Sequence, residues 1–227
     1  MNIKRSLNNI IKINEFAFLL IAYLVYIALT AITASDINDS LYESLTYFIF
    51  VHTILMPLYL FFVGRHDTYV NLLYCHIRFK SPRTVFFVRI IYLLVETAMF
   101  TVPYIFMTFI FAIVSRTNIS FLALILCGIN IFLNFLMVGI VACTISVKFR
   151  KDYLGAITAY LILCMDFMLV LGLLTWDFSF YYVPMLEVFT FTENVKILVS
   201  TAISVVKAVM VFGCAYMLFM FKKDNIE

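Results

Sequence analysis

Six long apolar runs, joined by short connections of alternating charge, constrain this chain more than any other feature. The runs cover residues 16–33, 44–63, 85–114, 119–146, 154–174 and 195–221. A helix needs about 20 apolar residues to cross the hydrocarbon of a bilayer. The runs therefore predict an all-α polytopic membrane protein with six transmembrane helices, in which residues 1–227 form a single transmembrane domain.

Composition supports lipid as the solvent for most of the chain. Hydrophobic residues make up 65% of the sequence, and charged residues make up only 13%. Soluble domains are roughly 45–50% apolar and about 25% charged, so a soluble fold of this length could not bury so much apolar surface. The net charge of +3 comes from the connections and indicates orientation rather than binding to nucleic acid.

The basic residues are strongly biased to one side of the predicted membrane. Only Arg116 and Lys196 lie in the connections of the opposite side, which are acidic. Because cytosolic connections carry an excess of Lys and Arg, both termini are expected in the cytosol. The basic residues of the cytosolic side are Lys4, Arg5, Lys12, Arg65, Arg78, Lys80, Arg83, Lys148, Arg150, Lys151, Lys222 and Lys223.

The connection between the second and third spans, residues 65–84, contains a candidate partner-docking helix. Its residues 67–79 have helical periodicity, and Pro82 is expected to end the helix. Two interpretations stay open: the helix docks into a groove of a cytosolic partner, or it lies on the bilayer with its basic end against anionic lipid. The candidate docking residues are Asp67, Val70, Asn71, Leu73, Tyr74, Ile77, Arg78 and Lys80.

A few ionisable side chains fall inside the predicted spans. Arg89 is close to the start of its span and is expected to snorkel to the interface. The deeper candidates for a polar transport path are His52, Glu96, Asp166 and Lys207. Two acids and one base at mid-membrane predict that Lys207 pairs with Asp166 or Glu96. Such pairs could line a path, join subunits or fix the fifth and sixth helices in place.

Other segments refine the predicted architecture. Residues 3–14 are predicted to form an amphipathic N-terminal helix of interfacial type. Pro57 and Pro103 are expected to kink the second and third spans. The aromatic residues 175–194 favour a re-entrant or interfacial segment between the last two spans, with an aromatic anchor as the alternative. The candidate residues of this segment are Trp176, Phe180, Tyr182 and Pro184.

The sequence lacks the motifs of several enzyme classes. It contains no GxxxxGK[ST] phosphate loop, no HExxH and no GxSxG. Its three histidines are not at metal-ligand spacing, and its five scattered cysteines do not suggest a disulfide framework. We therefore expect no catalytic residue, metal or cofactor on this chain.

This layout resembles the permease subunit of ABC-2-type transporters, in particular the small six-span permeases of Gram-positive peptide-export and bacteriocin-immunity systems. The resemblance rests on the six spans, the amphipathic start, the helix in residues 67–79, the segment at residues 175–194, and the basic aromatic stretch at residues 78–87. It implies a coupling helix between spans two and three, and a bacterial plasma membrane location.

The resemblance also implies partners and a cargo. A second permease subunit would pair with this one, and a separate ATP-binding-cassette ATPase would bind ATP and Mg²⁺ beneath them. The cargo would be an amphipathic peptide or lipid-like molecule leaving the cytosol or the inner leaflet. Two alternatives remain: an ion-coupled carrier or channel that uses His52, Glu96, Asp166 and Lys207, and a membrane scaffold that recruits a cytosolic partner through residues 65–84.

The charge bias makes a prediction about topology. A protease-cleavable tag after Glu227 should resist protease added to intact cells and become cleavable once the membrane is permeabilised. A tag placed at Asn118, in the predicted outer connection, serves as the control and should be cleaved in intact cells. Cleavage of the C-terminal tag in intact cells would contradict the predicted orientation.

Overall fold

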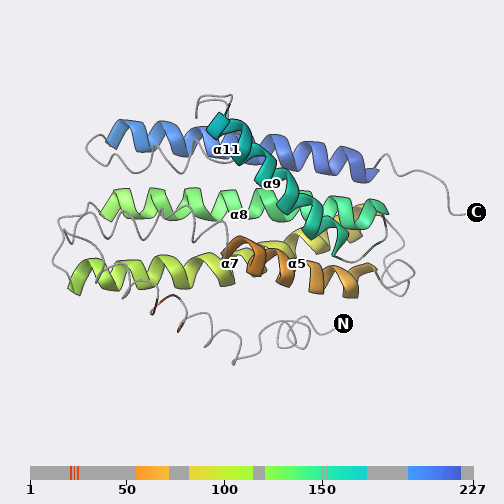
Figure 1. Ribbon diagram of the computed structural model, residues 1–227, viewed down its shortest axis with the longest axis horizontal. Helices are drawn as coiled ribbons and strands as arrows, with labels where there is room; N and C mark the ends of the chain where they lie inside the picture. Colours follow the sequence, from red (N-terminus) through yellow and green to blue (C-terminus); the bar gives the residue numbers. More distant parts are fainter. Residues whose placement is uncertain are drawn as a thin grey trace, which may run out of the picture.

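The described part of the chain is entirely helical. The computed structural model describes residues 55–71, 82–114, 121–149, 153–172 and 194–220, together with Ile21, Tyr23, Val25 and Lys151. Its long helices lie side by side as an elongated bundle (Figure 1). They are α5 (Met56–Asn71), α7 (Pro82–Val114), α8 (Phe121–Phe149), α9 (Leu154–Gly172) and α11 (Asn194–Met220).

Within this part of the chain, three helices are long and apolar enough to cross a bilayer. These candidate spans are Arg83–Met107 in α7, Gly128–Phe149 in α8 and Thr201–Met220 in α11. They fall within the predicted third, fourth and sixth spans, apart from a few residues at their ends. The structure is thus that of a helical membrane protein, while the number of spans and the side of each terminus stay predictions.

The shorter helices α5 and α9 belong to the second and fifth predicted spans. Helix α9 contains a shorter apolar stretch, Leu154–Asp166. Helix α5 does not end at residue 63, where the second span was predicted to end, but continues to Asn71. Of the first predicted span, only Ile21, Tyr23 and Val25 are described, and all three are helical.

The prolines occupy different positions in their helices. Pro82 was expected to end a helix, and it does precede a new one, because it is the first residue of α7. At this position its missing N–H costs no hydrogen bond. Pro57 is the second residue of α5 as described, and the helical residue Leu55 precedes this helix. Pro103 alone lies within a long helix, and α7 continues through it.

Helix α8 is the centre of the bundle. It contacts each of the other four helices, with α5 and α7 on one side and α11 on the other, while α9 crosses it obliquely (Figure 1). Of the apolar stretch that makes α8 a candidate span, 61% is buried inside the bundle, whereas only 11% of the corresponding stretch of α11 is buried. The five helices alternate in direction along the bundle, as successive membrane crossings would.

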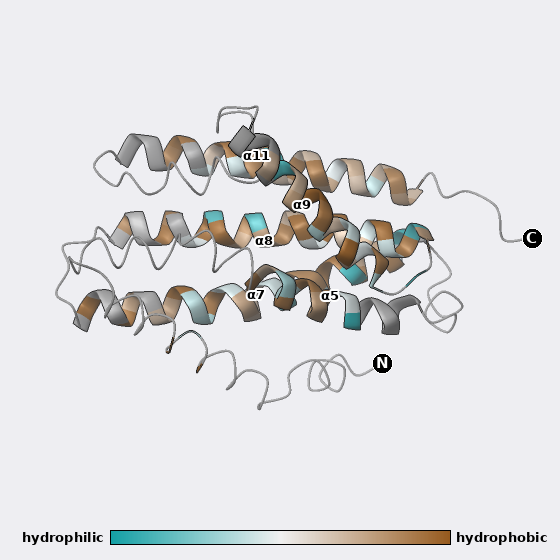
Figure 2. Ribbon diagram, viewed as in Figure 1, coloured by the Kyte–Doolittle hydropathy of each residue, from teal (hydrophilic) through white to brown (hydrophobic). Residues whose placement is uncertain are grey.

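The outer surface of the bundle is apolar. Figure 2 shows mostly hydrophobic residues along the outward faces of α9 and α11. On α11, for example, Val206, Val209 and Met210 are 58%, 65% and 59% exposed. A water-soluble monomer rarely exposes a continuous apolar surface of this extent, so these faces fit contact with lipid.

Glycine permits a close crossing of α8 and α9 just after a tight turn. A Cβ atom at Gly155 would collide with the carbonyl oxygen of Ala142, so only glycine allows this approach. The turn before it holds Tyr153 at a φ of 60°, which is uncommon for a residue with a side chain. The Ser146 hydroxyl donates to the Lys151 carbonyl at 3.1 Å and closes the turn.

This crossing leads to a prediction. Gly155→Ala should destabilise the protein by about 1–3 kcal/mol, because the added methyl group must push α8 and α9 apart. Gly213→Ala in α11 is the matched control, because nothing lies within 4 Å of its added Cβ. The control should be neutral or slightly stabilising, since alanine favours a helix over glycine. Thermal unfolding of the purified protein in one detergent measures both; equal effects would contradict the close crossing.

Candidate functional site

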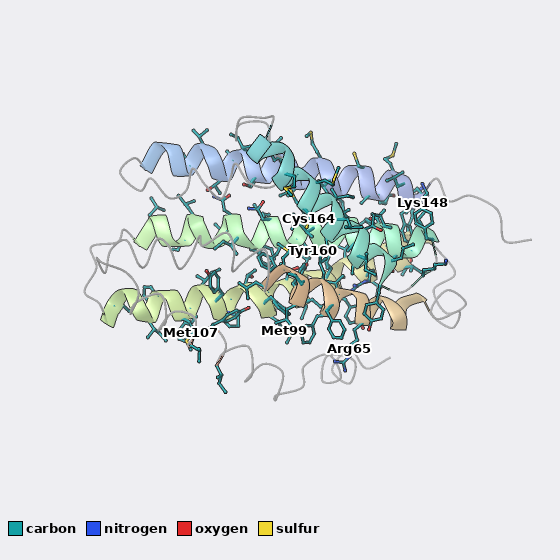
Figure 3. All side chains as sticks on the ribbon, viewed as in Figure 1. Arg65, Met99, Met107, Lys148, Tyr160 and Cys164 are labelled. Atoms are coloured by element: carbon teal, nitrogen blue, oxygen red, sulfur yellow. The ribbon has the colours of Figure 1, made fainter. Side chains whose placement is uncertain are left out.

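Basic side chains gather at one end of the bundle. Arg65 belongs to the last turns of α5, Arg83 is the second residue of α7, and Lys148 and Lys151 flank the end of α8. Figure 3 shows Arg65 and Lys148 at the same end of the bundle. Arg83, Lys148 and Lys151 are exposed. This grouping agrees with the charge bias of the sequence, and its placement in the cytosol remains a prediction.

The predicted docking helix does not begin as a separate element. Asp67, Val70 and Asn71 form the last turns of α5, which runs without a break from Met56. The sequence placed the start of this helix at Asp67, whereas α5 continues through that residue to Asn71. The side chains of these three residues and the remaining docking candidates, Leu73, Tyr74, Ile77, Arg78 and Lys80, lie outside the described residues.

A buried ion pair lies within α7. Arg89 and Glu96 are 2% and 3% exposed, and one guanidinium nitrogen lies 3.1 Å and 3.3 Å from the two carboxylate oxygens. The residues are two helical turns apart, about 10.5 Å along the axis, so both side chains extend along the helix to meet. The prediction that Arg89 snorkels to the interface is wrong, because Glu96 and the neighbouring helices provide the arginine with a polar site inside the protein.

The same arginine ties α7 to α5. Its second terminal nitrogen donates to the main-chain carbonyl of Val63 at 3.2 Å. The next residue, Gly64, packs against the ring of Tyr153 so closely that a Cβ there would come within 2.7 Å of the ring. Tyr153 also stacks on Phe61, with ring centroids 5.8 Å apart. Helix α5 is therefore held at adjacent residues by α7 and by the α8–α9 turn; we call this contact the α5 clamp.

A second polar contact joins α5 and α7 one turn away. The Thr97 hydroxyl donates to the Leu93 carbonyl at 2.7 Å, and it lies 2.9 Å from the Tyr59 hydroxyl. A threonine hydroxyl has one hydrogen, so Tyr59 is the donor to Thr97. The Tyr59 hydroxyl lies against Gly139 of α8. A Cβ atom at Gly139 would collide with this hydroxyl.

Two of the remaining polar candidates lie on helices other than that of the ion pair. Asp166 in α9 and Lys207 in α11 are both partly buried. Glu96, one of the two partners predicted for Lys207, is bonded to Arg89, and the pairing of Lys207 stays a prediction. His52 and the aromatic candidates Trp176, Phe180, Tyr182 and Pro184 lie outside the described residues.

Two features of the bundle were not found from the sequence. The first is a buried set of neutral polar side chains between α8 and α11; the spacing of Asn130 and Asn134, four residues apart on one helix face, was the available signal. The second is an apolar groove along one face of α7, of about 660 Å³, which includes Val95, Met99, and Met107. Figure 3 shows Met99 and Met107 on the same side of α7.

The described residues contain no group of three His, Cys, Asp or Glu side chains that could hold a metal ion. No family model matches the chain, and neither the curated proteins nor the solved structures compared with it gave a match. The functional argument therefore rests on this chain alone.

The ion pair makes a prediction about stability. Arg89→Met or Glu96→Met alone should destabilise the protein by about 3–5 kcal/mol, because each leaves an unpaired charge buried. The double variant should recover most of this loss. Lys148→Met, at an exposed position, is the control and should change stability by no more than about 0.5 kcal/mol.

Denaturant or thermal unfolding of the purified protein measures this cycle. Additive losses in the double variant would show that the two side chains do not depend on each other and would contradict the pairing.

Proposed function

We propose that this chain is the membrane-spanning permease subunit of an ATP-driven exporter, with the ATPase on a separate subunit. The observation that carries the proposal is the continuity of α5. This helix runs from the clamp at Val63 and Gly64 directly into Asp67, Val70 and Asn71, the first residues of the predicted docking segment. A force applied to that segment would reach the middle of the bundle without passing through a flexible joint.

The clamp would distribute such a force. Because Arg89 binds the Val63 carbonyl and Tyr153 packs on Gly64, a displacement of α5 would move α7 and the start of α9 with it. Rigid-body motion of packed helices is a common way to convert nucleotide binding into opening of a path. The ATPase would supply the energy, because the chain has no phosphate loop of its own.

The cargo class follows from the apolar character of the described surfaces. The α7 groove is lined almost wholly by apolar atoms, and its residues Val102 and Phe106 are both 57% exposed. Such a groove suits an acyl chain or the apolar face of an amphipathic peptide and offers little to a hydrophilic solute. We propose an amphipathic peptide or lipid-like cargo, carried across a bacterial plasma membrane by two paired permease subunits.

The buried pairing of Glu96 weighs against the ion-coupled carrier. A coupling carboxylate must exchange ions or protons with water during the cycle, whereas Glu96 is bonded to Arg89 and almost fully buried.

Gentle purification from the native membrane tests the proposal directly. A tag on this chain should retain a stoichiometric second protein that contains a phosphate-binding loop, and the complex should hydrolyse ATP. Ion-gradient-driven flux by the isolated chain, with no ATPase bound, would contradict the exporter and support the carrier. A retained partner without any flux would support the scaffold.

Charge reversal tests the docking segment. Arg78→Glu with Lys80→Glu should lower ATP-dependent export at least about tenfold, a loss of about 1.4 kcal/mol in coupling, while membrane insertion is unchanged. Lys148→Glu with Lys151→Glu is the matched control, because it reverses the same charge on the same predicted side of the membrane, outside the segment. Equal export by the two double variants would contradict a specific docking role.

A further inference from the structure

Neutral polar side chains are buried where α8 meets α11, and most of their hydrogen-bonding groups are unused. Asn130 and Asn134 of α8 are 1% and 0% exposed, and Ser204 of α11 is 0% exposed. The Asn130 amide donates to the Thr201 hydroxyl at 3.1 Å. Within the described part of the chain, the Asn130 oxygen, both polar atoms of the Asn134 amide and the Ser204 hydroxyl have no hydrogen-bond partner.

The direction of the helices brings these atoms together. Helices α8 and α11 run in the same direction (Figure 1). From the Asn130–Thr201 bond, four residues along α8 lead to Asn134 and three residues along α11 lead to Ser204. These steps advance about 6 Å and 4.5 Å in the same direction. Asn134 therefore lies level with Ser204, one turn along the same interface.

Such a cluster destabilises the folded protein unless its free donors and acceptors form hydrogen bonds with another molecule. A buried polar group without a partner destabilises the folded protein, and lipid supplies no partner from outside. A cluster of four such atoms in one interface thus points to a ligand. The surrounding α8 residues Ile131 and Met137 are apolar and fully buried, so they cannot serve as partners.

The types of the free atoms restrict the ligand. Two amide oxygens accept hydrogen bonds, the Asn134 amide nitrogen donates, and the Ser204 hydroxyl does either. A bare cation would match the oxygens but would face the Asn134 N–H group. An anion would match that N–H group but would face two carbonyl oxygens. A neutral group that both donates and accepts satisfies the whole set.

We propose that Asn130, Asn134 and Ser204 form a binding site between α8 and α11 for a small neutral group that donates and accepts hydrogen bonds. Water and a secondary amide, such as that of a peptide backbone, are the two sources of this chemistry. The site does not depend on the exporter role. Its opening requires only a shift of α11, the least buried of the candidate spans.

Magnetisation transfer from water to asparagine side chains tests the site in the full-length protein. The protein, ¹⁵N-labelled at asparagine, is placed in lipid nanodiscs, and Asn134→Leu and Asn130→Leu assign the two amide signals. Met137→Leu, a volume-conserving change one turn from Asn134, is the control and should leave both signals unchanged. We expect transfer to the Asn134 amide despite its complete burial. Should the asparagine variants fail to fold, Ser204→Ala assigns the site through the shift it causes in the Asn134 signal.

Two small amides, added separately to the nanodisc sample, distinguish water from a secondary amide as the bound group. Transfer that persists in N-methylacetamide identifies water as the ligand. Transfer that N-methylacetamide abolishes, but N,N-dimethylacetamide does not, identifies an amide, since only the first compound both donates and accepts. Absence of transfer together with no response to N-methylacetamide would overturn the proposal. A shift of the amide signals when sodium replaces choline would also overturn it, in favour of a cation site.

Discussion

The structure depends most on the three-way contact of Arg89. A guanidinium inside a membrane protein is tolerated only where its charge and its N–H groups find partners. Here Glu96 supplies the charge from the same helix, and the Val63 carbonyl supplies an acceptor from α5. Because the pair lies within α7, it forms as that helix forms. The bond to Val63 then fixes where α5 can lie, and α5 in turn leads to the segment proposed to meet the partner.

Close packing at glycines complements this polar contact. At three contacts among α5, α8, α9 and the α8–α9 turn, a Cβ would collide: Gly64 under Tyr153, Gly139 under Tyr59, and Gly155 against Ala142. In lipid no hydrophobic effect drives helices together, so small residues and interhelical hydrogen bonds decide which faces meet. The α5 clamp combines an interhelical hydrogen bond at Val63 with close packing at the adjacent Gly64. These two contacts explain how a short helix such as α5 is held firmly in the bundle.

Apolar length and period predicted the helices α7, α8, α9 and α11 well, because hydropathy over about 20 residues is a strong local signal. The same signal located the end of the apolar run at residue 63 but not the end of α5, because a helix can continue beyond the membrane as α5 does to Asn71. The partner of Arg89 was missed because seven residues separate it from Glu96, and sequence reasoning placed arginine at the interface by default. The asparagine cluster was also missed: its meaning depends on α11, whose Thr201 lies 71 residues after Asn130 in the chain and which packs in parallel to α8.

The central claim is that α5 moves as one body with the clamp when the ATPase acts on it. Spin labels at Arg65→Cys and Lys151→Cys, in a background without native thiols, report the distance between the end of α5 and the α8–α9 turn. Measured in the complete complex, this distance should be the same with and without a non-hydrolysable ATP analogue. A change as large as one helical turn, about 5.4 Å, would show that α5 slides past Tyr153 and would contradict the account.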